Sequence, residues 1–147
     1  MSRALLLLSL VLAAPAAAQV VQPCDWQASA ANLMEPWELN TRTFSNGRTR
    51  IAALDTVEPA LGWAWLMVLS PPYDEIGARQ CRVIGLAPSM GFAGLDFEAM
   101  ASDYDPATGL RLTLPVQVSP DGAGFETRVL SFIINQSTGE IGAGFEE

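Results

Sequence analysis

Carboxylates are the only abundant side chains in this chain that could carry acid–base chemistry. The 147 residues include 16 acidic and 8 basic side chains, every basic residue is arginine, and there is no histidine. A histidine-activated serine or cysteine nucleophile and a Schiff-base lysine are therefore excluded. Histidine-containing zinc sites and lysine-bearing phosphate loops are excluded for the same reason.

Paired carboxylates remain a catalytic possibility, because a glycosidase needs two carboxyl groups about 5–10 Å apart and no histidine. The available acids are Asp74, Glu75, Asp96, Glu98, Asp103, Asp105, Asp121 and Glu126. Their spacing selects no pair, and Asp and Glu are mostly exposed residues that keep a protein soluble. A His-free hydrolase is therefore the alternative function, not the first choice.

Segment 70–77 is the strongest candidate for recognition of a partner. It reads Ser-Pro-Pro-Tyr-Asp-Glu-Ile-Gly, and two consecutive prolines stiffen a loop, which lowers the entropy lost on binding. We expect Tyr73 to be the anchor, since aromatic residues dominate interface energetics. Asp74 and Glu75 would favour a basic partner surface. The alternative is an ordinary connection in which Pro and Gly only form the turn.

Metal and aromatic-ligand sites have less support. Segment 103–105 has acids at its first and third positions, like a calcium loop, but Ala107 and Thr108 stand where an EF-hand needs Asp or Asn and then Gly. We expect a turn there, and neither a metal nor a cofactor in the protein. Trp63 and Trp65 could stack on a sugar, but their apolar surroundings favour a place in the core.

The first eighteen residues have the layout of a secretory signal peptide. Arg3 precedes a Leu-rich apolar run over 4–14, and three alanines end at Ala18. A membrane anchor needs about 20 apolar residues, so this run is too short to span a bilayer. We expect cleavage near Ala18, before Gln19.

Export places the remaining single domain, residues 19–147, in an oxidising compartment. Abundant Ala, Arg, Gly and Pro without Lys are typical of GC-rich bacterial coding, so the expected location is periplasmic or extracellular. No later segment is long and apolar enough to span a membrane. The two cysteines, Cys24 and Cys81, are therefore expected to form a disulfide.

Turn signals separate short apolar segments, which is typical of an all-β sandwich or barrel. Asn46-Gly47 is the clearest, because both central residues of a type I′ turn need a positive φ. We predict a single antiparallel domain of eight strands, after an irregular segment 19–36 with one helical turn near 28–34. The strands are expected at 37–45, 48–55, 61–70, 79–86, 92–103, 110–118, 125–134 and 140–145.

Three strands have informative patterns. Leu110 to Val118 alternates apolar and polar residues, and Pro115 lacks an amide donor, so we expect this strand at a sheet edge. Segments 62–70 and 128–134 are apolar on both faces, which favours strands covered on both sides. Segment 95–104 also fits a helical stripe, but a hairpin with the following strand favours a strand.

The sequence therefore favours a non-catalytic binding domain of the cell envelope. A protein partner is the first choice and the His-free hydrolase is the second. A third possibility is a small apolar ligand, because a barrel of eight strands can enclose one. The net charge of −8 argues against nucleic acid, which needs a basic face to displace counterions. A solid core, an acidic cleft or an internal cavity would distinguish the binding domain, the hydrolase and the barrel.

Overall fold

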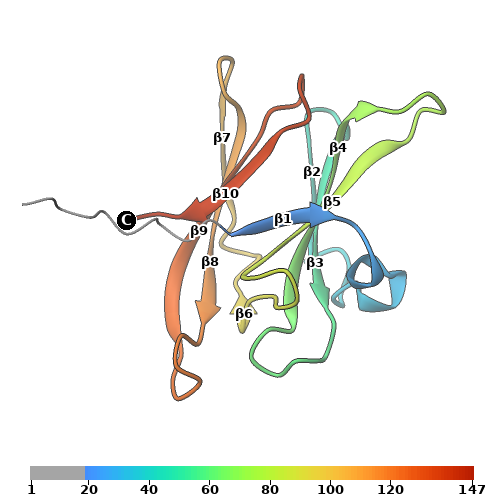
Figure 1. The fold of residues 1–147 in the computed structure, drawn as a ribbon. Helices are drawn as coiled ribbons and strands as arrows, with labels where there is room; N and C mark the ends of the chain where they lie inside the picture. The colour runs from blue at the N-terminus through green and yellow to red at the C-terminus, as the bar shows by residue number, and fades with distance from the viewer. Residues whose placement is uncertain (1–18) are drawn as a thin grey trace, which may run out of the picture.

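The computed structural model describes residues 19–147, which form two antiparallel five-stranded sheets (Figure 1). The first sheet has the order β1-β5-β4-β3-β2, with β1 at Val20–Pro23, β2 at Thr41–Phe44, β3 at Thr49–Asp55, β4 at Ala64–Tyr73 and β5 at Arg79–Gly85. The predicted signal peptide, residues 1–18, lies outside the described residues.

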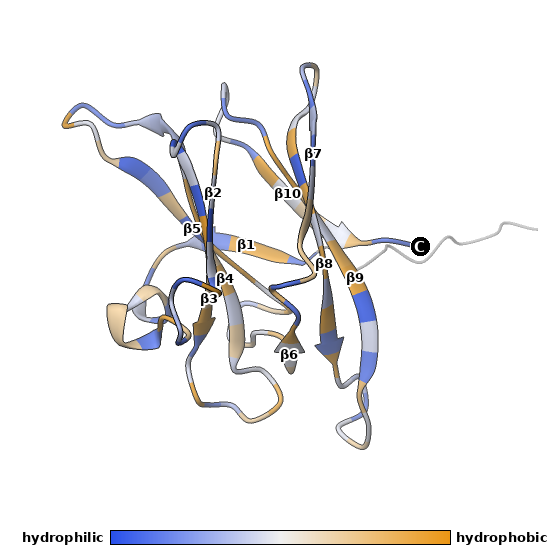
Figure 2. Ribbon diagram, turned by 180° about the vertical axis from the view of Figure 1, so that it is seen from behind, coloured by the Kyte–Doolittle hydropathy of each residue, from blue (hydrophilic) through white to orange (hydrophobic). Residues whose placement is uncertain are grey.

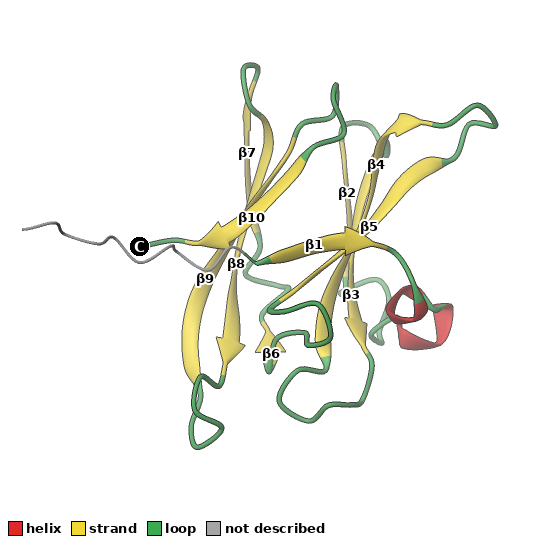
Figure 3. Ribbon diagram, viewed as in Figure 1, coloured by secondary structure: helices red, strands yellow, loops and turns green. Residues whose placement is uncertain are grey.

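The second sheet has the order β10-β9-β8-β6, and β7 also pairs with β8. Its strands are β6 at Gly94–Leu95, β7 at Ala101–Asp105, β8 at Gly109–Val118, β9 at Glu126–Ile134 and β10 at Ile141–Phe145. The all-β antiparallel prediction is confirmed, and the architecture is a sandwich of two separate sheets. In the described part of the chain the only helices are two 3₁₀ turns, Trp26–Ala28 and Ala30–Asn32 (Figure 3).

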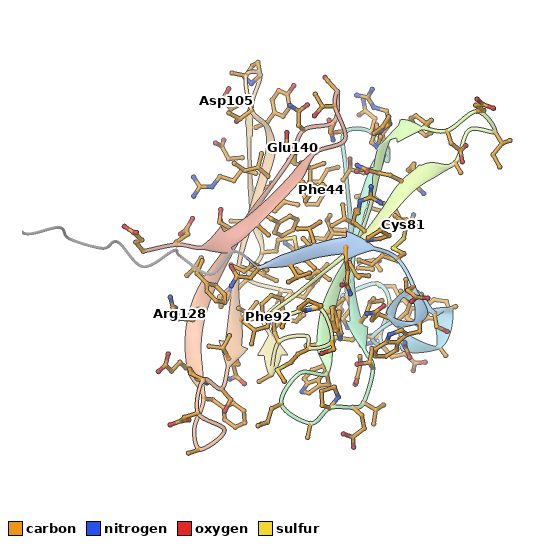
Figure 4. The ribbon with its side chains drawn as sticks, viewed as in Figure 1. Phe44, Cys81, Phe92, Asp105, Arg128 and Glu140 are labelled. Atoms are coloured by element: carbon orange, nitrogen blue, oxygen red, sulfur yellow. A yellow bond between two sulfur atoms is a disulfide. The ribbon has the colours of Figure 1, made fainter. Side chains whose placement is uncertain are left out.

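The core lies between the inner faces of the two sheets. Alternation along β8 places five side chains in it, as predicted: Leu110, Leu112, Leu114, Val116 and Val118. Figure 2 shows the resulting bands of hydrophobic and hydrophilic residues along β8 and β9. Side chains of β3 and β4 meet them from the other sheet, and Figure 4 places Phe44 and Phe92 between the layers.

The predicted edge position of β8 is wrong. This strand pairs with β9 from Leu110 to Val118 and with β6 and β7 on its other side. Pro115 is tolerated because it lies where that side is interrupted, between the last residue of β6 and the first of β7. The carbonyl of Pro115 still accepts a hydrogen bond from the Asp96 amide, at 2.9 Å. A strand can thus hold proline at a gap in its neighbour.

The central position of β4 is confirmed, and both of its faces are covered. Ala64, Leu66 and Val68 point into the main core, while Trp65 belongs to a second cluster on the outer face with Leu54 and Val83. Part of the segment 24–33 packs over this second cluster. The similar prediction for β9 is wrong, because its outer face is uncovered and Val129 is 38% exposed.

A disulfide holds the segment that covers Trp65. Cys24 and Cys81 are bonded, as predicted, and the Cys24 amide also donates to the Cys81 carbonyl at 3.2 Å. The prediction that 19–36 is irregular is wrong at its start, because β1 pairs with β5 from Val20 to Pro23. The predicted helical turn is replaced by the two 3₁₀ turns, which begin earlier.

The single strand predicted over 92–103 is divided into β6 and β7. Between them the chain turns, and Phe97 and Met100 are buried in the main core. Arg42 of β2 holds this turn, because its guanidinium donates to the carbonyls of Glu98 and Met100 at 2.8 and 2.7 Å. It also lies 5.7 Å from the centre of the Phe97 ring. This arginine therefore joins the two sheets along one side.

The turn around Asn46-Gly47 has the predicted positive φ angles, 56° and 80°. Ser45 also has a positive φ, 55°, and β3 begins at Thr49. The connection is therefore a four-residue loop and not the two-residue turn that Asn-Gly alone favours. Among residues 19–147, no helix is long and apolar enough to cross a membrane.

The close packing of the Trp65 ring against Gly85 of β5 leads to the first prediction. A Cβ added at Gly85 would lie 2.4 Å from Cζ3 of the fully buried Trp65 ring, which cannot move without disturbing the cluster around it. We expect Gly85→Ala to lower the free energy of unfolding by about 1–3 kcal/mol through overpacking. Gly144→Ala is the matched control, since a Cβ at this β10 position meets nothing within 4 Å. Equal urea denaturation curves for the two variants would contradict the conclusion that Trp65 packs too closely on Gly85 to admit a side chain.

The disulfide gives the second prediction. It closes a loop with a sequence separation of 57, and loss of a native disulfide from a small domain costs about 2–5 kcal/mol. We expect Cys81→Ala to lose this amount in denaturant unfolding, together with the ordered packing of residues 24–33 over Trp65. Wild-type protein unfolded under reducing conditions should lose a similar amount. An unchanged stability of both would show that the cover stays in place without the covalent bond.

Candidate functional site

A cavity lies at one end of the sandwich, where the strand connections of the two sheets meet. Its volume is about 580 Å³, within the range of small-molecule sites, about 300–1,000 Å³. The lining comes from the end of β4, the end of β7, the β2–β3 turn, the β7–β8 turn and the β9–β10 turn. These three turns and β7 rise to the upper end of Figure 1.

Both tyrosines of the chain line this cavity. Tyr73 ends β4 in the first sheet, and Tyr104 stands near the end of β7 in the second sheet. Their side chains are well exposed, at 49% and 60%. The fold therefore brings two solvent-facing phenol rings from opposite sheets to one concave surface.

Polar side chains cross between the sheets beside these rings. Gln136 of the β9–β10 turn donates through Nε2 to the hydroxyls of Ser45 and Thr49, both at 2.7 Å. Gln80 of β5 donates from the first sheet to the second, through a hydrogen bond to the Gly139 carbonyl at 2.8 Å. These two amides fix the β9–β10 turn against the first sheet, and so fix one wall of the cavity.

Two glycines let the turns approach closely. Gly139 has a φ of 82°, and a Cβ there would lie 2.5 Å from the ring of Pro72. Gly109, with a φ of 114°, opens β8, and a Cβ there would lie 2.3 Å from the Ile134 carbonyl oxygen. Asn135 completes the β9–β10 turn, since its Oδ1 accepts from the amides of Ser137 and Thr138 at 3.1 and 3.2 Å.

Arg48 supplies the only charge on the cavity lining. Its Nε donates to the Ser45 carbonyl at 3.2 Å, which leaves the two terminal nitrogens without a hydrogen-bond partner among the described residues. The one ion pair within residues 19–147 joins Arg111 to Glu146 on the second sheet. Arg48 therefore has no carboxylate partner in the described part of the chain, although the protein is acidic overall.

Two further polar groups that belong to lining residues make no hydrogen bond in the described part of the chain. Within residues 19–147, Nδ2 of Asn135 and Oε1 of Gln136 have no hydrogen-bond partner. The first is a donor and the second an acceptor, and both come from the turn that the inter-sheet amides hold in place. The cavity can therefore offer a cation, a donor, an acceptor and two aromatic faces at once.

Of the three residues proposed from the sequence, only Tyr73 lines the cavity. The expected loop is shorter than 70–77, because β4 continues to Tyr73 with a register shift that passes over the two prolines. Asp74 stabilises the following turn, where its Oδ1 accepts from the amides of Ile76 and Ala78 at 3.0 and 2.8 Å. Glu75 is exposed in that turn and lies outside the cavity lining.

Tyr104, Arg48 and Gln136 were not predicted from the sequence as site residues. No local pattern marks them, because they lie on separate connections that meet only once the sheets are stacked. The useful signal was the placement of both tyrosines directly before turn segments, since residues at strand ends lie near the rim of a sandwich. The order of the strands in the sheets decides which connections lie next to one another, and hydrophobic periodicity does not predict that order.

Several acids proposed for a hydrolase instead form turns. The carboxylates of Asp74, Asp96, Asp105 and Asp121 each accept a hydrogen bond from a backbone amide two to four residues further on. No group of three or more metal-ligating side chains occurs in the described part of the chain. No carboxylate lines the cavity that holds the two tyrosines.

Trp63 and Trp65, the two tryptophans considered for sugar stacking, have different environments. Trp65 is fully buried, as predicted. Trp63 is only half-buried and lines a second cavity of about 380 Å³, together with Leu95, Asp96 and Pro115. This cavity lies at the other end of the sandwich, where β4 begins, and is separate from the tyrosines.

Comparisons of the chain with protein-family models, with curated proteins and with solved structures gave no match.

The inter-sheet amides give the third prediction. Gln136→Ala removes the partner of the Thr49 hydroxyl, and Thr49 is fully buried. Loss of a partner for a buried polar group costs about 1–3 kcal/mol, and we expect this loss in thermal or urea unfolding. Gln117→Ala, at an exposed position of β8, should change stability by less than about 0.5 kcal/mol. A Gln136→Ala protein as stable as this control would mean that the amide does not fix the turn.

Proposed function

We propose that the protein is an exported, non-catalytic binding domain of the cell envelope, and that its ligand binds in the cavity between Tyr73 and Tyr104. One observation carries the proposal: the only tyrosines of the chain come from two different sheets, are both exposed and both line the same cavity. Buried tyrosines would contribute to stability, whereas exposed ones in a concave site are available for recognition.

The rigid surroundings of the cavity support the same proposal. Ligand-binding loops work best on a fixed scaffold, because little entropy is then lost on binding. Here the β9–β10 turn is held by Gln80 and Gln136, and the β2–β3 turn is held by Arg79, which donates to the Gly47 carbonyl at 3.2 Å. The site is therefore largely formed before any ligand arrives.

The proposed location is the periplasm or the extracellular space. Two observations support it: the signal-like composition of residues 1–18 and the disulfide between Cys24 and Cys81. Disulfides persist in oxidising compartments and are rare in the cytosol. The hydrolase alternative has no support from the cavity between the tyrosines, whose lining carries no carboxylate.

The fourth prediction tests the site. We expect Tyr73→Ala and Tyr104→Ala each to weaken binding by about 2 kcal/mol or more, roughly 30-fold, as expected for aromatic anchors. Stability should change little, because both rings are exposed. Envelope material of the producing cell would be separated into a glycan fraction and a protein fraction, and each fraction would be immobilised. Surface plasmon resonance would then measure how strongly each fraction retains the exported protein.

Phe125→Ala is the matched control for this experiment, since Phe125 is 62% exposed on the β8–β9 connection, at the opposite end of the sandwich. It should bind like the wild type. The proposal fails if each envelope fraction that binds the wild type retains Tyr73→Ala and Tyr104→Ala as strongly as it retains Phe125→Ala. It also fails for Tyr73 if Tyr73→Ala lowers the melting temperature while binding per folded molecule is unchanged.

A further inference from the structure

We infer that the ligand of the tyrosine-lined cavity is an acidic saccharide, whose carboxylate binds Arg48 while its ring faces contact Tyr73 and Tyr104. This inference rests on the proposed function, which it narrows to one class of ligand. Four properties of the lining carry it: the absence of large aliphatic side chains, the two tyrosines, the unpaired guanidinium and the free amide groups.

The lining does not suit an apolar anchor. Among the described residues that form it, there is no Leu, Ile, Val, Met, Phe or Trp. A peptide partner gains most of its affinity by inserting apolar or aromatic side chains into apolar pockets, and most drug-like ligands also need them. Apart from the tyrosines and Arg48, the side chains here are neutral amides and hydroxyls or the small surfaces of Pro and Ala. A strongly hydroxylated ligand fits this surface.

The two tyrosines suit a sugar ring. The face of a pyranose presents several C–H groups, which carry partial positive charge, and the face of an aromatic ring is electron-rich. Tyrosine adds a hydroxyl that can bond to the sugar at the edge of the contact. Tyr73 and Tyr104 come from different sheets and line one cavity of about 580 Å³, so a short oligosaccharide could contact both.

Arg48 adds a requirement for negative charge. Its terminal nitrogens have no partner in the described part of the chain, and no carboxylate lines the cavity. A guanidinium presents its donors in a planar fork that matches a carboxylate. In a protein with a net charge of −8, an unpaired arginine in a cavity gives a local site for an anion.

The free amide groups complete the match. Nδ2 of Asn135 can donate and Oε1 of Gln136 can accept, and a sugar hydroxyl can do both. The same turn also contributes Ser137 and Thr138 to the lining. Discrimination between hydroxylated ligands depends on such fixed polar groups, because an unmatched one is left unpaired.

Defined oligosaccharides test the inference with the disulfide-bonded exported protein. Two acidic probes represent the two sources of a sugar carboxylate: a trimer of mannuronic acid for uronic-acid polymers, and N-acetylglucosaminyl-N-acetylmuramic acid for the cell wall. Their neutral counterparts are mannotriose and chitobiose. Isothermal titration calorimetry at low and high salt should find binding of at least one acidic probe and little of its neutral counterpart.

Variants identify the residues responsible. We expect Arg48→Gln to weaken binding of the acidic probe by about 10-fold or more, as for loss of a charged hydrogen bond, and to remove most of the salt dependence. Arg50→Gln is the matched control, because Arg50 lies exposed on β3 and outside the cavity lining. Tyr104→Phe should retain most of the affinity that Tyr104→Ala loses, since the ring face is kept.

Other outcomes would overturn the role of the carboxylate, the saccharide inference or the proposed function. Equal affinity for acidic and neutral probes, or an Arg48→Gln protein that binds normally, would overturn the role of the carboxylate. If no saccharide binds while retention on the envelope protein fraction still depends on the tyrosines, the saccharide inference is wrong and the proposed function stands. Binding that survives both tyrosine-to-alanine changes would overturn the proposed function itself.

Discussion

The need to cover both faces of β4 determines the rest of the structure. One face, with Leu66 and Val68, requires a second sheet opposite it. The other face carries Trp65, whose ring is fully buried against Gly85 and needs a cover that no strand provides. The N-terminal segment supplies this cover, and the disulfide from Cys24 keeps it there. Burial of a tryptophan contributes several kcal/mol, which explains why a covalent bond secures this place.

One side and one end of the sandwich are held by polar groups. Arg42 joins the sheets along one side through two carbonyls and the Phe97 ring. Gln80 and Gln136 join them at the end that carries the tyrosines. Because these amides and the neighbouring turns already satisfy the local backbone, the phenol rings are not needed to close the end of the core. They remain exposed, and this is the property on which the proposed site depends.

Much of the fold could be predicted from local patterns. The alternation in β8, the two apolar faces of β4 and the pairing of Cys24 with Cys81 follow from residue types and spacing, and all three were found. The errors have a common cause in tertiary context. β1 is only four residues long and is held by β5 and the disulfide, and Pro115 fits inside a sheet only because β6 and β7 leave a gap beside it.

The candidate site was predicted only in part, for the same reason. Tyr73 could be singled out because prolines and acids surround it in the sequence. Asp74 appeared functional by the same criterion, but its carboxylate binds the backbone of its own turn. Tyr104 and Arg48 join the site through the stacking of two sheets and the meeting of three turns. Such a meeting has no signature in one sequence without the strand order.

The restriction of tyrosine to one cavity also makes the protein suited to spectroscopy. Both tyrosines of the chain line the same cavity, so 3-fluorotyrosine incorporation would place every fluorine label at that cavity. A fluorine NMR spectrum would then contain two resonances and no background from the core. Nitration of tyrosine would report solvent access to the same two positions. Because tyrosine occurs only at this cavity, fluorine labelling and nitration of tyrosine both probe the cavity specifically.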